Sequence, residues 1–174
     1  MLGSTDIMFM SSRAGTDSYN RLFTEAFIRP GLDPERWQNR ANYVALNVVP
    51  TSKTEMSVYH TSGHRYVIRT DGFISVRAGA TEGELVTKML TFNGNELVIN
   101  FSTAAAGGIQ VEIQESEGNP IPGFSIKDCP VIVGDKIEHI VSWNGKTDLR
   151  AISGKPVRLR FVMVEADIFS LRFK

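Results

Sequence analysis

The stretch Arg69-Thr70-Asp71-Gly72-Phe73 divides this chain of 174 residues into two parts of different sequence character. The part before it is irregular and rich in polar segments, and it is interrupted by Pro30, Pro34 and Pro50. After it, short segments of alternating apolar and polar residues follow one another, separated by turn residues. We therefore predict a boundary at this stretch, with residues 1–69 and 70–174 as two regions.

The second region has the two-residue period that places alternate side chains of a β-strand on a buried face. This alternation runs through four segments, at residues 97–101, 109–114, 157–163 and 169–173. Glycine, asparagine and proline favour tight turns, and they mark three sites between or beside these segments: Asn93-Gly94, Ala106-Gly107-Gly108 and Glu117-Gly118-Asn119-Pro120. The pattern predicts an all-β fold of the β-sandwich, jelly-roll-like type. One helical turn is expected near residues 148–152.

The first region holds too little regular sequence to form a domain of its own. It contains four strand candidates, Ile7–Ser11, Leu22–Ile28, Met56–His60 and Tyr66–Arg69. Long polar loops join them. Loops of this length inside a compact domain are typical of a functional segment or of a fragment of a larger fold.

Composition narrows the classes of partner. The chain carries 19 basic and 19 acidic residues, scattered along its length, for a formal net charge of +0. Nucleic acids and anionic membranes select for basic stripes, so neither is expected as a partner. The single cysteine, Cys129, rules out an internal disulfide and a multi-cysteine metal site, and we expect it to be a small buried side chain.

The sequence shows no recognisable signal that targets the chain to a cellular compartment. No segment approaches the roughly 20 apolar residues that a membrane-spanning helix needs. The residues after Met1 lack the basic-then-apolar order of a secretory signal and read as an arbitrary beginning. A longer, secreted parent protein stays open, and so does the localisation.

Several short segments together resemble a known architecture. The runs Phe9-Met10-Ser11-Ser12-Arg13, Phe23-Thr24-Glu25-Ala26-Phe27-Ile28-Arg29-Pro30-Gly31 and Met56-Ser57-Val58-Tyr59 resemble late-blade strands of five-bladed β-propeller glycosidases. Residues 66–174 resemble the β-sandwich that follows the propeller in glycoside hydrolase families 32 and 43. The signature there is carried by Gly123-Phe124-Ser125, Gly134-Asp135, Ser142-Trp143 and residues 154–161.

The resemblance implies residual propeller blade strands at residues 1–69 and a β-sandwich domain at residues 70–174. It also implies that most catalytic acids of such a glycosidase would lie upstream of Met1. Glycoside hydrolysis needs two carboxyl groups that flank the scissile bond. Glu25 and Glu55 are the candidates within this chain for a surviving acid. We therefore expect no catalysis by this chain on its own, and a carbohydrate as its ligand.

Aromatic side chains are the candidate sugar-binding residues, because the C–H groups of a sugar ring pack against an exposed π face. Trp143 lies at a predicted strand end, Trp37 follows Pro34 in a loop, and Tyr59 lies in a blade-like strand. Tyr66 and Phe124 are further candidates, and Arg13 is a candidate polar contact. The alternative for each aromatic residue is packing in the core or in an interface.

The histidines do not suggest a transition-metal site. His60 and His64 lie in a predicted hairpin loop, and His139 is far along the chain. Metal binding needs convergent histidine and carboxylate ligands. A structural calcium ion near Asp135 or Asp71 is the alternative, although no recognisable acidic loop supports it.

Three functions stay open. The chain could be a non-catalytic carbohydrate-associated sandwich module, part of an active glycosidase, or a structural domain that touches no sugar. Unpaired blade strands leave edges that another chain can cover, so we expect a homo-oligomer or packing against a propeller domain.

Overall fold

The computed structural model describes residues 3–38 and 40–174 of an all-β protein with curled antiparallel sheets. The chain divides into two compact units, Met1–Ile68 and Arg69–Lys174. No described helix is long and apolar enough to span a membrane.

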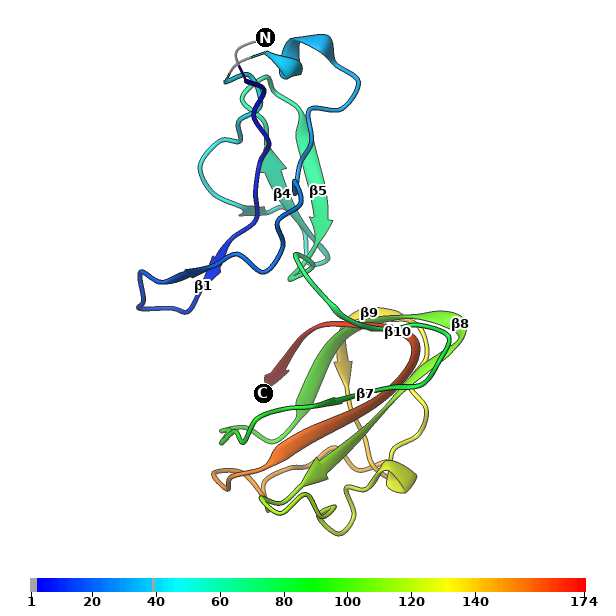
Figure 1. Ribbon diagram of the computed structural model, residues 1–174. Helices are drawn as coiled ribbons and strands as arrows, with labels where there is room; N and C mark the ends of the chain where they lie inside the picture. Colours follow the sequence, from blue (N-terminus) through cyan, green and yellow to red (C-terminus); the bar gives the residue numbers. More distant parts are fainter. Residues whose placement is uncertain (1–2, 39) are drawn as a thin grey trace. The chain divides into compact units, whose positions relative to one another are not determined.

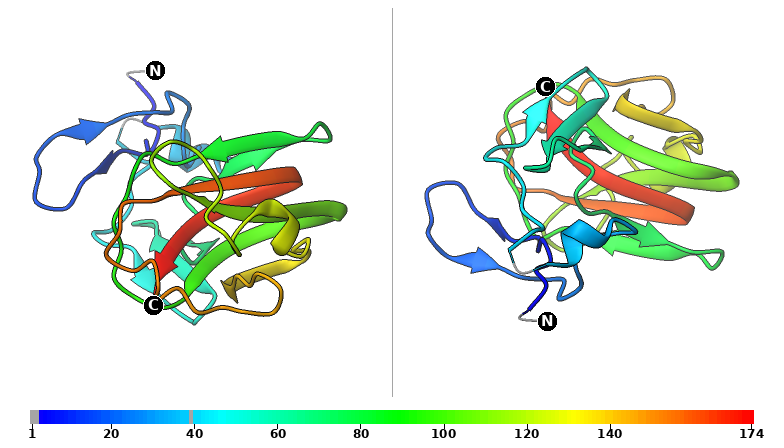
Figure 2. Two further views of the ribbon diagram at one scale, coloured as in Figure 1. Left: turned by 90° about the horizontal axis from the view of Figure 1, so that it is seen from below. Right: turned by 90° about the horizontal axis from the view of Figure 1, so that it is seen from above.

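Two very long strands form the centre of the C-terminal unit. β8 covers Leu97–Gln114 and β10 covers Arg158–Phe173, and they pair antiparallel from Arg158↔Gln114 to Phe173↔Leu97. Figure 1 shows both strands strongly curved, and they stay adjacent in the two views of Figure 2. The strand β9 (Asp135–Ile140) extends the sheet beside β8, while β6 (Val76–Ala78) and β7 (Gly83–Val86) pair with β10.

The curvature lets both halves of each long strand face one hydrophobic core. The predicted inward residues Ile109, Val111 and Ile113 are fully buried, which confirms the two-residue period there. The same core is completed by residues from the other end of β8, from β10 and from the loop before β10, among them Leu97, Ile99, Phe101, Trp143, Leu149, Leu159 and Phe161.

The predicted turn at Ala106-Gly107-Gly108 is wrong, because β8 continues through it. A Cβ at Gly107 would lie 2.5 Å from the carbonyl oxygen of Glu165 and 2.6 Å from that of Val164. Here β10 carries a register shift between Val164 and Ala166, and Glu165 has a φ of 42°. Gly107 therefore allows the β10 backbone to approach closely at the bend of the sheet. A glycine inside a strand often marks such a close approach rather than a turn.

The N-terminal unit contains less regular structure. The strands β3 (Val49–Pro50), β4 (Glu55–Tyr59) and β5 (Arg65–Arg69) form a small sheet in that order, and β1 (Ser11–Ser12) pairs with β2 (Tyr19–Asn20). The predicted strand Leu22–Ile28 does not form, and only Ile28 makes an isolated bridge, to Ile7. The expected strands at 56–60 and 66–69 correspond to β4 and β5.

Two short 3-10 helices complete the structure, η1 (Pro34–Trp37) and η2 (Ile126–Asp128). Proline fits the first position of η1 because its missing N–H has no partner there in any helix. The Asp33 side chain accepts a hydrogen bond from the backbone N–H of Glu35 at 3.0 Å. The single turn expected near residues 148–152 forms, with Ile152 N–H donating to the Leu149 carbonyl at 3.0 Å.

Candidate functional site

A pocket of about 500 Å³ opens on the C-terminal unit between two turns. One wall is Pro122-Gly123-Phe124, which precedes η2, and the other is Lys146-Thr147-Asp148, which follows a tight hairpin turn. The volume is within the ~300–1,000 Å³ range of small-molecule sites.

Backbone conformation fixes both walls. Gly123 has a φ of 86°, which suits glycine, and the Phe124 carbonyl accepts a hydrogen bond from the Ile113 N–H of β8 at 2.9 Å. In the other wall, Asn144 and Gly145 have φ values of 49° and 77°. Two successive residues with positive φ form the type I′ turn that closes tight hairpins. This turn places Lys146 at the pocket.

Asp128 links the two walls. Its Oδ1 accepts from Asn144 Nδ2 at 2.7 Å, and its backbone carbonyl accepts from the Asn144 N–H at 2.7 Å. Its Oδ2 accepts from the backbone N–H and the hydroxyl of Ser125, at 3.1 and 2.8 Å. Hydrogen bonds from Ser125, and then from Asn144, lower the pKa of Asp128. The Asp128 carboxylate therefore ties the turn at Asn144 to the segment that begins at Ser125.

Phe124 is half-buried in the pocket wall and rests on the core. Its ring meets the Trp143 ring edge-on, with centroids 5.3 Å apart and planes at 75°. Trp143 is fixed in turn, since its Nε1 donates to the Val111 carbonyl of β8 at 2.8 Å. Edge-to-face aromatic pairs contribute about 0.5–1.5 kcal/mol beyond the area that they bury. The Phe124 ring therefore has a defined orientation.

The two charged residues of the pocket lining, Asp148 and Lys146, differ in whether they have an ion-pair partner. Asp148 is bound by Arg150, whose Nε lies 3.0 Å from both carboxylate oxygens and whose Nη2 lies 2.7 Å from Oδ2. The Arg150 side chain, and then its backbone N–H, lower the pKa of Asp148 to about 2. Within residues 3–38 and 40–174, no carboxylate forms an ion pair with Lys146.

The prediction that Trp143 is a platform for a sugar ring is wrong. Its side chain is 1% exposed, so neither face of the indole is open to a ligand. The packing alternative agrees with this position. The residue next to the pocket surface is Phe124, which was among the further candidates, and Trp143 supports it from below.

The other predicted ligand-binding residues lie in the N-terminal unit. Trp37 is 47% exposed on η1, and its Nε1 donates to the Gly31 carbonyl at 2.8 Å. Tyr59 is 37% exposed at the end of β4. Arg13 is exposed beside β1, and its carbonyl accepts from Thr16. Tyr66 is half-buried and lies under the Arg36 guanidinium, 5.6 Å from its ring centroid. Arg13, Trp37 and Tyr59 thus lie on three separate segments of this unit, beside β1, on η1 and at the end of β4.

The two candidate acids are both exposed. Glu55 forms a 3.5 Å ion pair with Arg65 on the neighbouring strand. Glu25 lies in an irregular segment outside every strand. Neither belongs to the pocket of the C-terminal unit.

The acidic residues proposed for calcium have protein partners. Asp135 forms a 2.6 Å ion pair with Arg69, and Asp71 accepts from the Ser170 hydroxyl at 3.0 Å. In the described part of the chain, no group of three or more His, Cys, Asp or Glu side chains is arranged to hold a metal ion. Cys129 is buried against β8, and burial raises the pKa of its thiol.

Sequence reasoning missed Lys146, Thr147 and Asp148. The type I′ signal Asn144-Gly145 directly before them marks a turn, but it does not reveal the tertiary contacts that bring this turn to the Phe124 segment, the Asp128–Asn144 hydrogen bonds and the Phe124–Trp143 ring pair. Comparison with known proteins adds no assignment, because no protein-family model, curated protein or solved structure matches this chain.

Proposed function

We propose that this chain is a non-catalytic, carbohydrate-binding β-sandwich module that accompanies a glycoside hydrolase-like propeller. The observation that carries the proposal is the pocket between Gly123-Phe124 and Lys146-Thr147-Asp148. It combines part of an aromatic ring with a hydroxyl, an ammonium and a carboxylate. Sugars are recognised by this combination, because their rings present C–H groups to aromatic side chains and hydroxyls to polar ones.

Preorganisation supports binding in this pocket. The walls are tied together through Asp128, and Phe124 rests on the buried indole of Trp143. A ligand would therefore meet a Phe124 ring that loses little conformational freedom on binding, which favours affinity.

Binding fits the pocket better than hydrolysis does. A glycosidase needs one carboxyl group that is protonated near neutral pH and a second one across the scissile bond. Asp148 is the carboxyl group that lines the pocket, and its pKa of about 2 keeps it ionised. It can accept hydrogen bonds from sugar hydroxyls but cannot serve as a general acid.

The sandwich and blade assignments are part of this proposal. The described strands of the C-terminal unit form one curled sheet around a single core, and we propose that its two halves are the facing layers of a sandwich at residues 70–174. The three-stranded sheet β3-β4-β5 is one strand short of a four-stranded propeller blade, which agrees with residual blade strands at residues 1–69.

Affinity electrophoresis of the full chain in gels that contain single polysaccharides tests the proposal. We expect at least one polysaccharide to slow the protein. Phe124→Ala and Thr147→Val should each reduce that retardation, and Phe23→Ala, at an exposed ring outside the pocket, should not. Thr147→Val is nearly isosteric, so it separates lost contacts from misfolding. Equal retardation of all variants, or no retardation of the wild type by any polysaccharide, would refute the proposed site.

A second role as an interaction domain is favoured by the N-terminal unit. Large apolar side chains are exposed in it, including Tyr19, Leu22, Phe23, Leu32, Trp37, Tyr43 and Leu46. Exposed apolar surface of this kind is typical of interfaces. We expect self-association at micromolar concentration, measured by light scattering. A monomer across the concentration range would count against this role and leave the sugar pocket untouched.

A further inference from the structure

We infer that the pocket selects anionic glycans, whose carboxylate or sulfate group pairs with Lys146. This inference rests on the proposed function and names the ligand class of the same site. It follows from the charge balance of the pocket and from the fixed position of the turn that carries the lysine.

The charge balance comes from one ion pair, Asp148–Arg150, and from the neighbouring Lys146. Asp148 and Arg150 form a bidentate ion pair, with Nε 3.0 Å from Oδ1 and Nη2 2.7 Å from Oδ2, so their charges offset each other. Lys146 lies two residues away on the same wall, and no described carboxylate pairs with it. Of the charged side chains that line the pocket, Lys146 is therefore the one without an ion-pair partner among the described residues.

The hairpin turn holds this charge at the pocket wall. The Trp143 and Lys146 backbones exchange two hydrogen bonds, at 2.8 and 2.9 Å, and Asn144 is tied to Asp128. The Lys146 backbone is thus fixed, while its side chain is exposed and can reach a ligand anion. Phe124 on the opposite wall contributes the apolar contact for the sugar ring.

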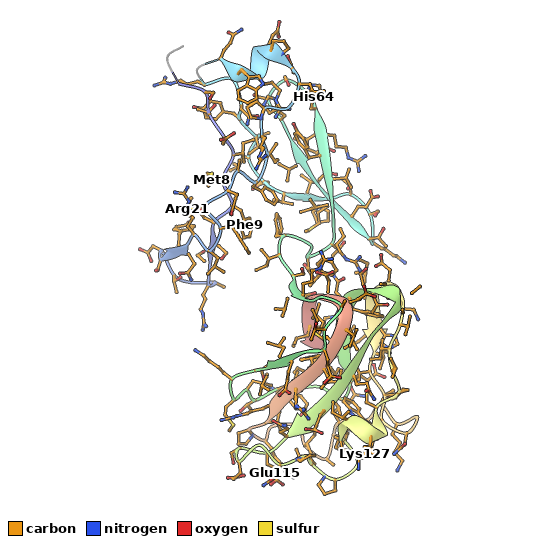
Figure 3. The ribbon with its side chains drawn as sticks, turned by 45° about the vertical axis from the view of Figure 1, so that its right-hand side comes forward. Met8, Phe9, Arg21, His64, Glu115 and Lys127 are labelled. Atoms are coloured by element: carbon orange, nitrogen blue, oxygen red, sulfur yellow. The ribbon has the colours of Figure 1, made fainter. Side chains whose placement is uncertain are left out.

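The whole chain does not attract polyanions by its total charge, because its formal net charge is +0. Preference for an anionic glycan would therefore come from local charge. Lys127 serves as the control for Lys146. It is an exposed lysine on η2, labelled in Figure 3, and it does not line the pocket. It matches Lys146 in side chain and in exposure.

Two pairs of polymers isolate the charge of the ligand. Polygalacturonate is compared with its methyl ester, and dextran sulfate with dextran, by affinity electrophoresis of the full chain. We expect retardation by the anionic member of at least one pair and weaker retardation by its neutral partner. The first pair reports a carboxylate and the second a sulfate, so together they identify the anion.

The lysine variants test the residue. Lys146→Gln should weaken binding of the anionic polymer about fivefold, which is the effect of about 1 kcal/mol that a solvent-exposed ion pair contributes. Lys127→Gln should leave it unchanged. Raising the ionic strength to about 1 M should remove most of the difference between wild type and Lys146→Gln, because salt screens exposed charges.

Failure of the anionic selectivity can be distinguished from failure of glycan binding itself. Retardation by neutral polymers as strong as by their anionic partners, or equal losses in Lys146→Gln and Lys127→Gln, would overturn the anionic selectivity and leave glycan binding in place. Absence of retardation by every polymer would overturn the proposed function and this inference together.

Discussion

His60 is the residue whose surroundings most clearly predict a response to pH. It is 3% exposed in the turn between β4 and β5, and its Nδ1 accepts from the Ser62 backbone N–H at 3.1 Å. A proton on Nδ1 would remove that bond and leave the Ser62 hydroxyl, 2.6 Å away, as the acceptor. No described residue makes a hydrogen bond to the buried Nε2 atom. Burial, and then the nearby charges of Arg36 and His64, lower the pKa of His60, while Asp33 opposes this in part.

A lowered pKa in the folded state means that the unfolded state takes up the proton more readily. The stability that neutral His60 contributes is therefore present above pH ~6.5, the ordinary value for histidine, and is lost as the pH falls through the lower folded value. We expect the midpoint temperature of thermal unfolding of the N-terminal unit to decrease as the pH is lowered from 7.5 to 5. NMR peak intensities of residues 43–66 against temperature measure it.

Two variants separate His60 from other groups. His60→Asn keeps an acceptor for the Ser62 N–H but cannot titrate, so it should flatten the pH dependence. His64→Asn, at an exposed ring in the same turn, should weaken it only in part, because burial is a larger cause of the lowered pKa of His60 than the His64 charge. A pH dependence that persists in His60→Asn would mean that other groups cause it.

At the scale of elements, the bend shared by β8 and β10 depends on two glycines with different neighbours. A Cβ at Gly107 would meet backbone atoms, the Glu165 and Val164 carbonyl oxygens. A Cβ at Gly108 would meet the Val131 Cγ1 at 2.4 Å, but Val131 is 61% exposed and its side chain can rotate away. The two positions therefore differ in how far their surroundings can yield.

We expect Gly107→Ala to destabilise the C-terminal unit by about 1–3 kcal/mol, the usual cost of overpacking against atoms that cannot move aside. Gly108→Ala should change the free energy of unfolding by less than about 1 kcal/mol, and Val131→Ala should remove that effect. Urea denaturation followed by tryptophan fluorescence of the buried Trp143 measures both, with Trp37→Phe as background to isolate the signal. Equal losses at the two glycines would contradict the role of the β10 backbone at the bend.

The same bend explains where sequence analysis of the elements failed. The alternation in residues 109–114 identifies an amphipathic strand by itself, and the buried side chains agree with it. A glycine pair has two uses, in a turn and at a close backbone approach, and sequence alone does not separate them. In the N-terminal unit, the segment 22–28 has strand-forming residues but lacks a neighbouring strand to pair with, apart from the single bridge at Ile28.

At the scale of the whole molecule, the sequence indicates a β-rich C-terminal region and a less regular N-terminal one, and the structure divides the chain between Ile68 and Arg69. Arg69 is held in the second unit by Asp135, by the Asn100 side chain at 2.9 Å and by the Phe169 ring. These partners lie far along the chain from Arg69, so no local sequence pattern predicts the contacts.

The pocket could not be found from the sequence for the same reason. It is built by two turns about twenty residues apart, and it depends on Asp128 to join them and on a buried tryptophan to support Phe124. The sequence names Trp143 and Phe124 as separate sugar-binding candidates with core packing as the alternative, because a strand end does not reveal which side chain faces the core.

The most direct measurement of the central claim is an NMR titration of the ¹⁵N-labelled full chain with a short oligogalacturonate. The account predicts that the amide shifts that move with ligand concentration cluster at Gly123, Phe124, Lys146, Thr147 and Asp148. Thr147→Val should weaken the response. Shifts that cluster instead around Trp37 and Tyr59, or a spectrum unchanged by this and by matching neutral oligosaccharides, would contradict the assignment of the pocket as a glycan site.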